Sequence, residues 1–142
     1  LAWLAKMNRE NVDFYVKGTN RANQRVWAAA GAALNDLVQR DPAAERFADQ
    51  VWHEAIAAIR NDGLIEAELG RGQMALAYHI YSLSATLVLE AARHARGGNE
   101  TPQDKQRLSL LIAGLGRTLC DPTPMEKLAG TKISIPNGEW AY

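Results

Sequence analysis

The stretch RGQMALAYHIY, from Arg71 to Tyr81, holds side chains that can bind anions or exchange protons at a regular spacing. Seven residues on an α-helix make almost two turns and rise roughly 10 Å, so Arg71 and Tyr78 are expected on one face. Tyr81 follows three residues later and extends that face. Such a ridge could contact one extended polyanion. Periodicity alone favours a simpler alternative, half-buried core tyrosines and a solvated Arg71 at the helix start.

A second polar group lies upstream in TNRANQRVWAAAGAAL, from Thr19 to Leu34. Together the two stretches resemble the catalytic region of the alginate lyases of polysaccharide lyase family 5. That family carries an Asn-His pair, a Trp three residues after the His, then an Arg, and a Tyr seven residues after the Arg. The order and both spacings agree between about Asn20 and about Arg96, roughly half the chain. The matching positions are Asn23, Gln24, Trp27, Arg71 and Tyr78, with Tyr81 at the place of a further sugar-contacting tyrosine.

The resemblance implies cleavage of an anionic polysaccharide, alginate or a related polyuronate, by β-elimination. Asn23 and Arg71 would neutralise the uronate carboxylate, one by amide donation and the other by charge, so that the proton on C5 becomes acidic. Tyr78 would act as base toward C5 and as acid toward the leaving O4, and the nearby Arg71 would help it to ionise. Trp27 would stack on a sugar ring or lie in the core, two equal alternatives. Tyr81 would stack or form a hydrogen bond.

One position of the catalytic region departs from the family pattern. Gln24 stands where the family has histidine, and an amide cannot take up a proton at physiological pH. Gln24 can still donate a hydrogen bond to a carboxylate, so proton transfer would depend on Tyr78. A single proton carrier suits mannuronate and glucuronate, whose C5 hydrogen and O4 share one ring face, and does not suit guluronate. Two alternatives stay open: a weakened relative that binds the polymer without turnover, and a helical interaction module without an active site.

The composition indicates a folded protein without a strong net charge. The 142 residues are 47% hydrophobic, enough for one domain with its own core. Sixteen basic and sixteen acidic residues cancel, so no overall field attracts nucleic acid or an anionic membrane, and a polyanion must be bound locally. Cys120 is the only cysteine, which excludes an internal disulfide. We expect it to be buried because it ends an apolar face.

Apolar residues recur at helical spacing along most of the chain, and turn or capping residues separate the repeats. The pattern predicts an all-α fold of antiparallel helical hairpins, with Leu64 to Gly70 as an extended or looped connector. The resemblance further implies part of an incomplete α/α toroid. Residues 129–142 are expected to form an irregular tail anchored by Trp140. The expected helices are Leu1 to about Val16, Val26 to Gln39, Pro42 to Asn61, Arg71 or Gln73 to Arg96, and Pro102 to Cys120.

The same spacing predicts which helix faces are buried. The apolar face of one helix is expected to comprise Val26, Ala30, Leu34, Leu37 and Val38, and the buried stripe of another to comprise Leu108, Leu111, Ile112, Leu115 and Leu119. The segment ALAYHIYSLSATLVLEAA is apolar nearly all round, so the long helix that contains it is expected to be covered on several sides.

The chain is expected to form a single all-α unit, residues 1–142, and to be a fragment of a longer toroid domain. It begins with neither an initiator Met nor a signal pattern, and the lyase family has a considerably longer catalytic domain. We therefore expect an N-terminal portion of the same domain to complete the cleft. No apolar stretch reaches the length of a membrane span. The resemblance implies a periplasmic or secreted location.

The sequence favours neither metal nor nucleotide chemistry. None of His53, His79 and His94 stands in a recognised zinc-binding spacing, so no metal or other cofactor is expected. His79 would point about 100° away from Tyr78 on a helix, and we expect a buried histidine that forms local hydrogen bonds. No nucleophile elbow, phosphate loop or dinucleotide motif is present, and the carboxylates form no recognisable glycosidase pair.

Overall fold

The computed structural model describes residues 2–17 and 22–135, and within these ranges the protein is all-helical, as the sequence predicts. The extended backbone described there pairs only in an isolated antiparallel bridge between Ile59 and Ile65. Among the described helices, none is both long enough and apolar enough for a membrane crossing. The elements are α1 (Ala2–Val16), α2 (Ala22–Gln39), α3 (Pro42–Ala57), α4 (Glu66–Leu69), the 3-10 turn η1 (Gly72–Met74), α5 (Ala75–Ala95), α6 (Pro102–Cys120) and α7 (Thr123–Ala129).

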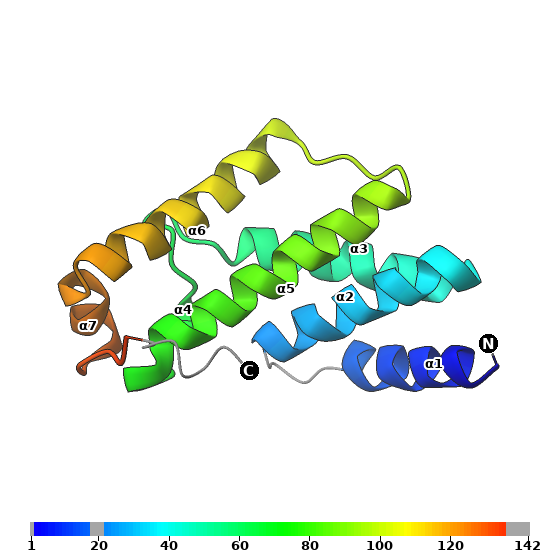
Figure 1. Cartoon of the computed structure of the whole chain (residues 1–142), viewed down its shortest axis with the longest axis horizontal. Coiled ribbons are helices and arrows are strands. Elements are labelled where there is room, and N and C mark those ends of the chain that lie inside the picture. The colour runs from blue at the N-terminus through cyan, green and yellow to red at the C-terminus, as the bar shows by residue number, and fades with distance from the viewer. Residues whose placement is uncertain (1, 18–21, 136–142) are drawn as a thin grey trace.

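The long helices that follow one another in the chain run in alternating directions (Figure 1), as expected for antiparallel hairpins. α2 packs against α1, α3 and α5. α2 and α5 are separated in sequence by α3 and the connector, yet they lie side by side and point the same way. The start of α2 therefore faces the first half of α5, and α4 and η1 contact α5 near the same place.

Local sequence signals account for where two of the helices begin. Asp41 is the N-cap of α3, where its side chain accepts a hydrogen bond from the Ala43 N–H, and Pro42 occupies the first turn. Thr101 begins α6 with a complete capping box, in which the Thr101 and Asp104 side chains each accept a hydrogen bond from the other's backbone N–H. These contacts depend on neighbouring residues alone, so both helix starts agree with the sequence prediction.

Alanine rather than leucine forms the buried face of α2. Leu34 and Val38 were predicted on that face, but they are 48% and 68% exposed. Small side chains allow the helices around α2 to approach closely, and this close packing leaves the larger residues on the outer side. The predicted face is correct at Val26 and Ala30, which are buried, and wrong at Leu34 and Val38, because apolar spacing did not weigh the short side chains. The buried alanines are Ala28, Ala29, Ala30, Ala32 and Ala33.

The buried stripe of α6 is narrower than its apolar pattern suggests. Leu111 and Leu115 are buried, whereas Ile112 and Leu119 are 49% and 51% exposed. The expectation of a buried Cys120 is also wrong, because its thiol is exposed at the end of the helix. α6 packs against α3, α5 and α7 along one side only, so residues at the edge of the stripe stay in contact with solvent.

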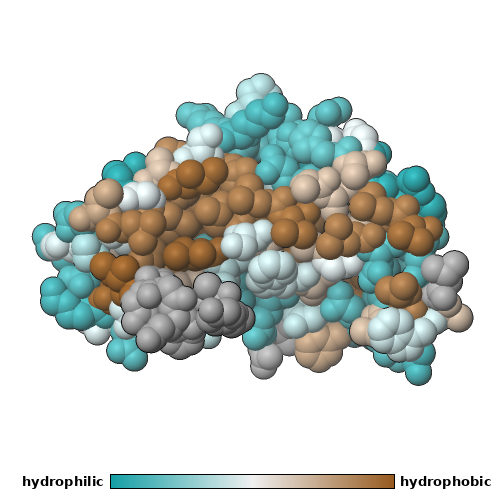
Figure 2. Space-filling view, viewed as in Figure 1, coloured by the Kyte–Doolittle hydropathy of each residue, from teal (hydrophilic) through white to brown (hydrophobic). Residues whose placement is uncertain are grey.

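α5 is covered on several sides, as its apolar sequence predicts, but the covering is not complete. It packs against α2, α3, α4 and α6 and buries Leu76 and Leu89 entirely. Leu87 remains 40% exposed. Figure 2 shows apolar side chains forming a band across the face that is also seen in Figure 1.

The segment between α3 and α5 differs most from the predicted helices. α3 ends at Ala57 instead of Asn61, because the chain turns back so that the Arg60 N–H donates to the Leu64 carbonyl over 2.9 Å. The predicted connector, Leu64 to Gly70, contains the short helix α4, and α5 begins at Ala75 after η1 rather than at Arg71.

The chain after α6 forms one more short helix, α7, which the sequence did not predict. Residues 131–135 are irregular, whereas Ala129, the first residue of the predicted tail, ends α7. The Ser134 N–H donates to the Gln73 carbonyl over 2.8 Å. This bond holds the start of the tail against η1. Trp140, the predicted anchor, lies outside the described residues.

His79 links the turn before α4 to the first turn of α5. Its Nδ1 donates to the Ala75 carbonyl over 2.7 Å, and its Nε2 accepts the Ile65 N–H over 2.9 Å. These partners require the neutral ring with the proton on Nδ1. Burial of the ring lowers the pKa of His79. The residue is therefore the buried, locally bonded histidine that the sequence analysis expects.

The turn that precedes Leu64 packs so closely against the backbone of α6 that no side chain fits between them. Gly63 has a φ angle of +81°, and a Cβ atom there would lie 2.0 Å from the Leu110 carbonyl oxygen. A Cβ atom on Gly114 would lie 2.6 Å from the Gly63 carbonyl oxygen. Both glycines are needed for this close approach, which sets the position of the turn and of the chain that leads into α4.

Gly114→Ala is expected to lower the free energy of unfolding by about 1–3 kcal/mol, because the added Cβ must push two backbones apart. Gly116→Ala is the matched control in the same helix, since no atom beyond the nearby backbone of its own helix lies within 4 Å of its added Cβ. It is expected to be neutral or to stabilise by up to about 1 kcal/mol. Urea unfolding followed by circular dichroism measures both. Equal effects at the two positions would contradict the close approach.

The free energy of unfolding is expected to fall as the pH is lowered below the ordinary histidine pKa of 6.5. The pKa of His79 is lowered in the folded protein, so only the unfolded chain binds this proton, and stability is lost toward acid by at most about 1.4 kcal/mol per pH unit. His79→Gln should flatten the dependence of stability on pH between about 7.5 and 5.5. His53→Gln, at an exposed position, is the control. An unchanged pH dependence in His79→Gln would contradict the assignment.

Candidate active site

A buried carboxylate lies among the polar residues that the sequence analysis selects. The side chain of Glu68, on α4, is fully shielded from solvent. Asn23, from the first turn of α2, places its Nδ2 3.4 Å from both Glu68 oxygens. The Ser82 hydroxyl, on α5, donates to Oε1 over 2.9 Å, and Arg71 Nε lies 3.5 Å from Oε2. One carboxylate thus joins side chains from α2, from α5 and from the residue before η1.

Arg71 connects this buried cluster to two tyrosines at the surface. Its Cζ lies 4.8 Å from the centre of the Tyr78 ring, and the Tyr78 and Tyr81 rings meet edge to face with centres 5.9 Å apart. The Arg71 side chain is 39% exposed and Tyr81 is 38% exposed. Arg71 precedes η1 and does not belong to α5, so its guanidinium reaches over the ring instead of standing two turns away.

The residues predicted on α2 differ in their exposure. Asn23 is only 5% exposed and points into the Glu68 cluster. Gln24 is exposed in the same turn, and Trp27, one turn further, is 43% exposed. Trp27 is therefore not a plain core tryptophan, and the alternative that it stacks on a ligand remains. The geometry joins Asn23, Arg71, Tyr78 and Tyr81 through contacts, and the roles of these residues, like those of Gln24 and Trp27, stay predictions.

Glu68 and Ser82 are the members of the cluster that the sequence analysis missed. Glu66 and Glu68 alternate with apolar residues, and nothing local distinguishes them. On α4 the two side chains point in nearly opposite directions. Glu66 is exposed and pairs with Arg60, whereas Glu68 is buried. The spacing of three residues between Glu68 and Arg71, which suits an ion pair on one helical turn, was the available signal.

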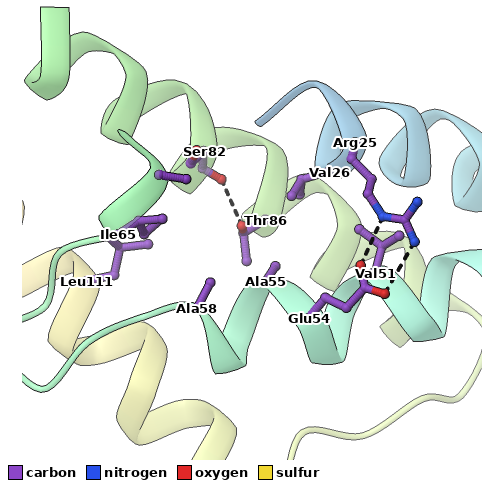
Figure 3. Close-up of a pocket in the computed structure, with 11 residues that line it drawn as sticks. Arg25, Val26, Val51, Glu54, Ala55, Ala58, Ile65, Ser82, Thr86 and Leu111 are labelled. Carbon is purple, nitrogen blue, oxygen red and sulfur yellow. Dashed lines mark hydrogen bonds and ion pairs between the residues drawn. The ribbon is translucent and has the colours of Figure 1, made fainter. Parts of the chain in front are cut away.

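An apolar pocket lies beside the cluster but has little chemistry of its own. Its volume is about 340 Å³, and it lies between α2, α3, α5 and α6 (Figure 3). Ser82 and Thr86 line one wall, where the Thr86 hydroxyl donates to the Ser82 carbonyl over 2.8 Å. At another wall Arg25 forms an ion pair with Glu54, with Nε 2.9 Å from Oε2. None of the residues that resemble catalytic positions lines this pocket.

A possible metal-ligand group lies at the opposite end of α5. Glu90, His94 and Glu100 each place one donor atom within 4.8 Å of the others. His94 follows Glu90 by four residues, a spacing that the expectation of no metal site overlooked. His94 Nε2 lies 2.6 Å from Glu100 Oε1, and burial together with the charge of Glu100 raises the pKa of Glu90. A polar contact between His94 of α5 and Glu100 of the following loop accounts for this arrangement.

Comparison with known proteins identifies the family. The family described as Alginate lyase matches residues 1–119. The chain is 32% identical to an "Alginate lyase" from Azotobacter chroococcum over 138 residues, which cover 91% of this chain and 35% of the relative. An "Alginate lyase" from Azotobacter vinelandii is 30% identical over the same coverage. A "Polysaccharide lyase" from Stenotrophomonas maltophilia is 29% identical over 96 residues, 67% of this chain and 29% of the relative.

The chain spans about a third of the length of these relatives. The family match nevertheless extends over most of this chain and includes the stretches that contain Asn23, Arg71 and Tyr78. The sequence match, the helical fold and the clustered polar residues agree, and the chain belongs to the alginate lyase family.

Proposed function

We propose that this chain carries catalytic residues of a polysaccharide lyase that cleaves polyuronates, alginate in particular, by β-elimination. The observation that carries the proposal is the shared contact of Asn23 and Arg71 with Glu68, with Arg71 lying over Tyr78. An amide donor, a cation and a phenol thus lie in one connected group that reaches from the core to the surface. The family match and the names of the relatives support the same class of reaction.

The proposed reaction has three linked events. Asn23 and Arg71 bind the uronate carboxylate, which lowers the cost of negative charge as the C5–H bond breaks. Tyr78 removes the C5 proton, the electron pair forms the C4–C5 double bond, and the C4–O4 bond breaks. The leaving O4 takes a proton from Tyr78, which returns the residue to its starting state. The products are a shortened chain and a chain that begins with an unsaturated uronate.

The remaining residues are assigned to substrate binding. Gln24 donates a hydrogen bond to the uronate carboxylate, Trp27 stacks on a sugar ring, and Tyr81 contacts a neighbouring sugar. The exposure of Trp27 and Tyr81 supports these assignments, since a polymer can reach both side chains. The proposal includes the α/α toroid and the periplasmic or secreted location that the family implies, with no metal cofactor in the reaction.

Gln24 favours a second candidate function, binding of the polymer without cleavage. Gln24 cannot act as the proton carrier that histidine provides in the family, so the protein could bind the polymer without turning it over. The first test is therefore the absorbance of the unsaturated product on incubation with polymannuronate, together with calorimetric binding of the same polymer. Product formation supports the lyase, and binding without product supports the second function. Neither signal would contradict both and would favour an interaction module without an active site.

Tyr78→Phe is expected to reduce turnover by about 10²- to 10⁴-fold, the range that general acid–base catalysis contributes, and to leave polymer binding nearly unchanged. The ring that lies beneath Arg71 is retained, and only the hydroxyl is lost. Steady-state measurement of product absorbance gives the effect. Tyr15→Phe, on α1, is the matched control and should keep full turnover. Near-normal turnover in Tyr78→Phe would exclude Tyr78 as the proton carrier.

The wild-type protein is expected to cleave mannuronate blocks and to leave guluronate blocks intact. A single tyrosine can serve only a C5 hydrogen and an O4 on the same ring face, because the opposite arrangement needs separate base and acid groups. Gln24→His should raise turnover by up to about 10²-fold and extend it to guluronate. Gln50→His, an exposed change on α3, is the control. Comparable wild-type rates on purified blocks of both kinds would overturn the single-tyrosine mechanism.

A further inference from the structure

We infer that Glu68 is a positioning residue that sets the orientation of Asn23 and Arg71 toward the substrate carboxylate, an inference that rests on the proposed function. Glu68 has no exposed side-chain surface and therefore cannot touch the polymer itself. Two residues proposed to bind the same substrate group nevertheless both contact its carboxylate. A change at Glu68 would therefore act on catalysis through these two side chains.

Glu68 makes one short hydrogen bond, which anchors its carboxylate, and two longer contacts with the residues that it would orient. Ser82, on α5, provides the anchor, with its hydroxyl 2.9 Å from Oε1. Asn23 and Arg71 lie further away, at 3.4 and 3.5 Å. The carboxylate is thus held from one side and presents its charge to both donors. Hydrogen bonds of catalytic residues are often long before substrate binds and tighten only in the complex.

The geometry at Arg71 shows which donors remain for substrate. Glu68 is approached through Nε, while the guanidinium carbon lies 4.8 Å from the centre of the Tyr78 ring and the Arg71 side chain is 39% exposed. A planar guanidinium held at one edge can rotate little, and its other edge suits a second carboxylate. Glu68 therefore orients Arg71 between the buried cluster and the tyrosine that we propose moves the proton.

A purely structural role for Glu68 would leave a different signature. If Glu68 only attached α4 to α2 and α5 through its hydrogen bonds with Asn23 and Ser82, its loss would affect stability and would lower activity to the same degree whether or not Arg71 is present. A positioning role requires Arg71 and Asn23 for its effect. The two roles are separated by a double-mutant cycle, in which residues that act through one another give non-additive losses.

The experiment measures kcat/KM on mannuronate oligomers for the full-length protein, Glu68→Gln, Arg71→Ala and the double variant, with melting temperatures for each. Gln has the size of Glu but lacks the charge, and its NH2 group would face other donors. We expect Glu68→Gln to lower kcat/KM by about 10²-fold, mainly in kcat, because misplacement of catalytic groups by about 1 Å has effects of this size. In the Arg71→Ala background the same change should cost less than about threefold.

The matched control is Glu66→Gln, the same substitution at an exposed position of the same short helix. It should change kcat/KM by less than about twofold, since surface charges away from a site contribute little. Glu68→Asp keeps the charge and should restore part of the loss in kcat. If Glu68→Gln fails to fold, Ser82→Ala replaces it in the cycle, because it removes the anchor of Glu68 and leaves the charge in place.

The outcomes distinguish this inference from the proposed function. A wild-type protein that neither forms product nor binds the oligomer overturns both. Wild-type turnover with additive losses in the cycle, or with folded Glu68→Gln and Ser82→Ala variants that keep full activity, overturns only the positioning role. If wild type binds without turnover, the oligomer affinity replaces kcat/KM in the same cycle, and non-additive losses support the inference while additive losses overturn it.

Discussion

A carboxylate that is removed from water must be compensated by hydrogen-bond donors or a cation, since an unpaired buried charge costs several kcal/mol. Glu68 meets this condition only where three parts of the chain come together. The start of α2 supplies Asn23, the second turn of α5 supplies Ser82, and the residue before η1 supplies Arg71. A shift of α2 along α5 by one turn would remove Asn23 from the carboxylate. The demands of this one charge therefore fix the register of the helices around the candidate site.

The packing of α2 makes that register possible. Its buried alanines allow α1, α3 and α5 to lie close on several sides, and the same direction of α2 and α5 brings their early turns together. Further polar contacts hold the other ends of these helices. Arg96 at the end of α5 pairs with the buried Asp36 of α2, and Arg93 lies 4.9 Å over the Trp52 ring of α3. The helices are thus held by charged contacts at both ends, with alanine and larger apolar side chains between.

The break in helical structure before α5 determines how Arg71 and Tyr78 meet. Had the helix continued through Gly70, Arg71 and Tyr78 would stand about 10 Å apart along one axis. The turn η1 instead places the guanidinium over the phenol ring, and α4 brings Glu68 beneath it. These short segments hold Glu68 in the core and leave the Arg71 side chain partly exposed. The apolar pocket on the other side of Ser82 is not lined by Arg71 or Tyr78. The candidate site is therefore identified by its polar side chains and not by the size of a cavity.

The sequence by itself determined the features that depend on near neighbours. Asp41 and Thr101 predict helix starts because their caps bond residues in the next turn, and the spacing of Arg71 and Tyr78 predicts one shared face, whereas their contact depends on η1. Tertiary structure alone decided which face of α2 is buried, that Glu68 rather than Glu66 enters the core, and that Asn23 meets a carboxylate 45 residues away. Each of these depends on how closely and in which direction whole helices pack. Periodicity describes one helix at a time and carries no information on that packing.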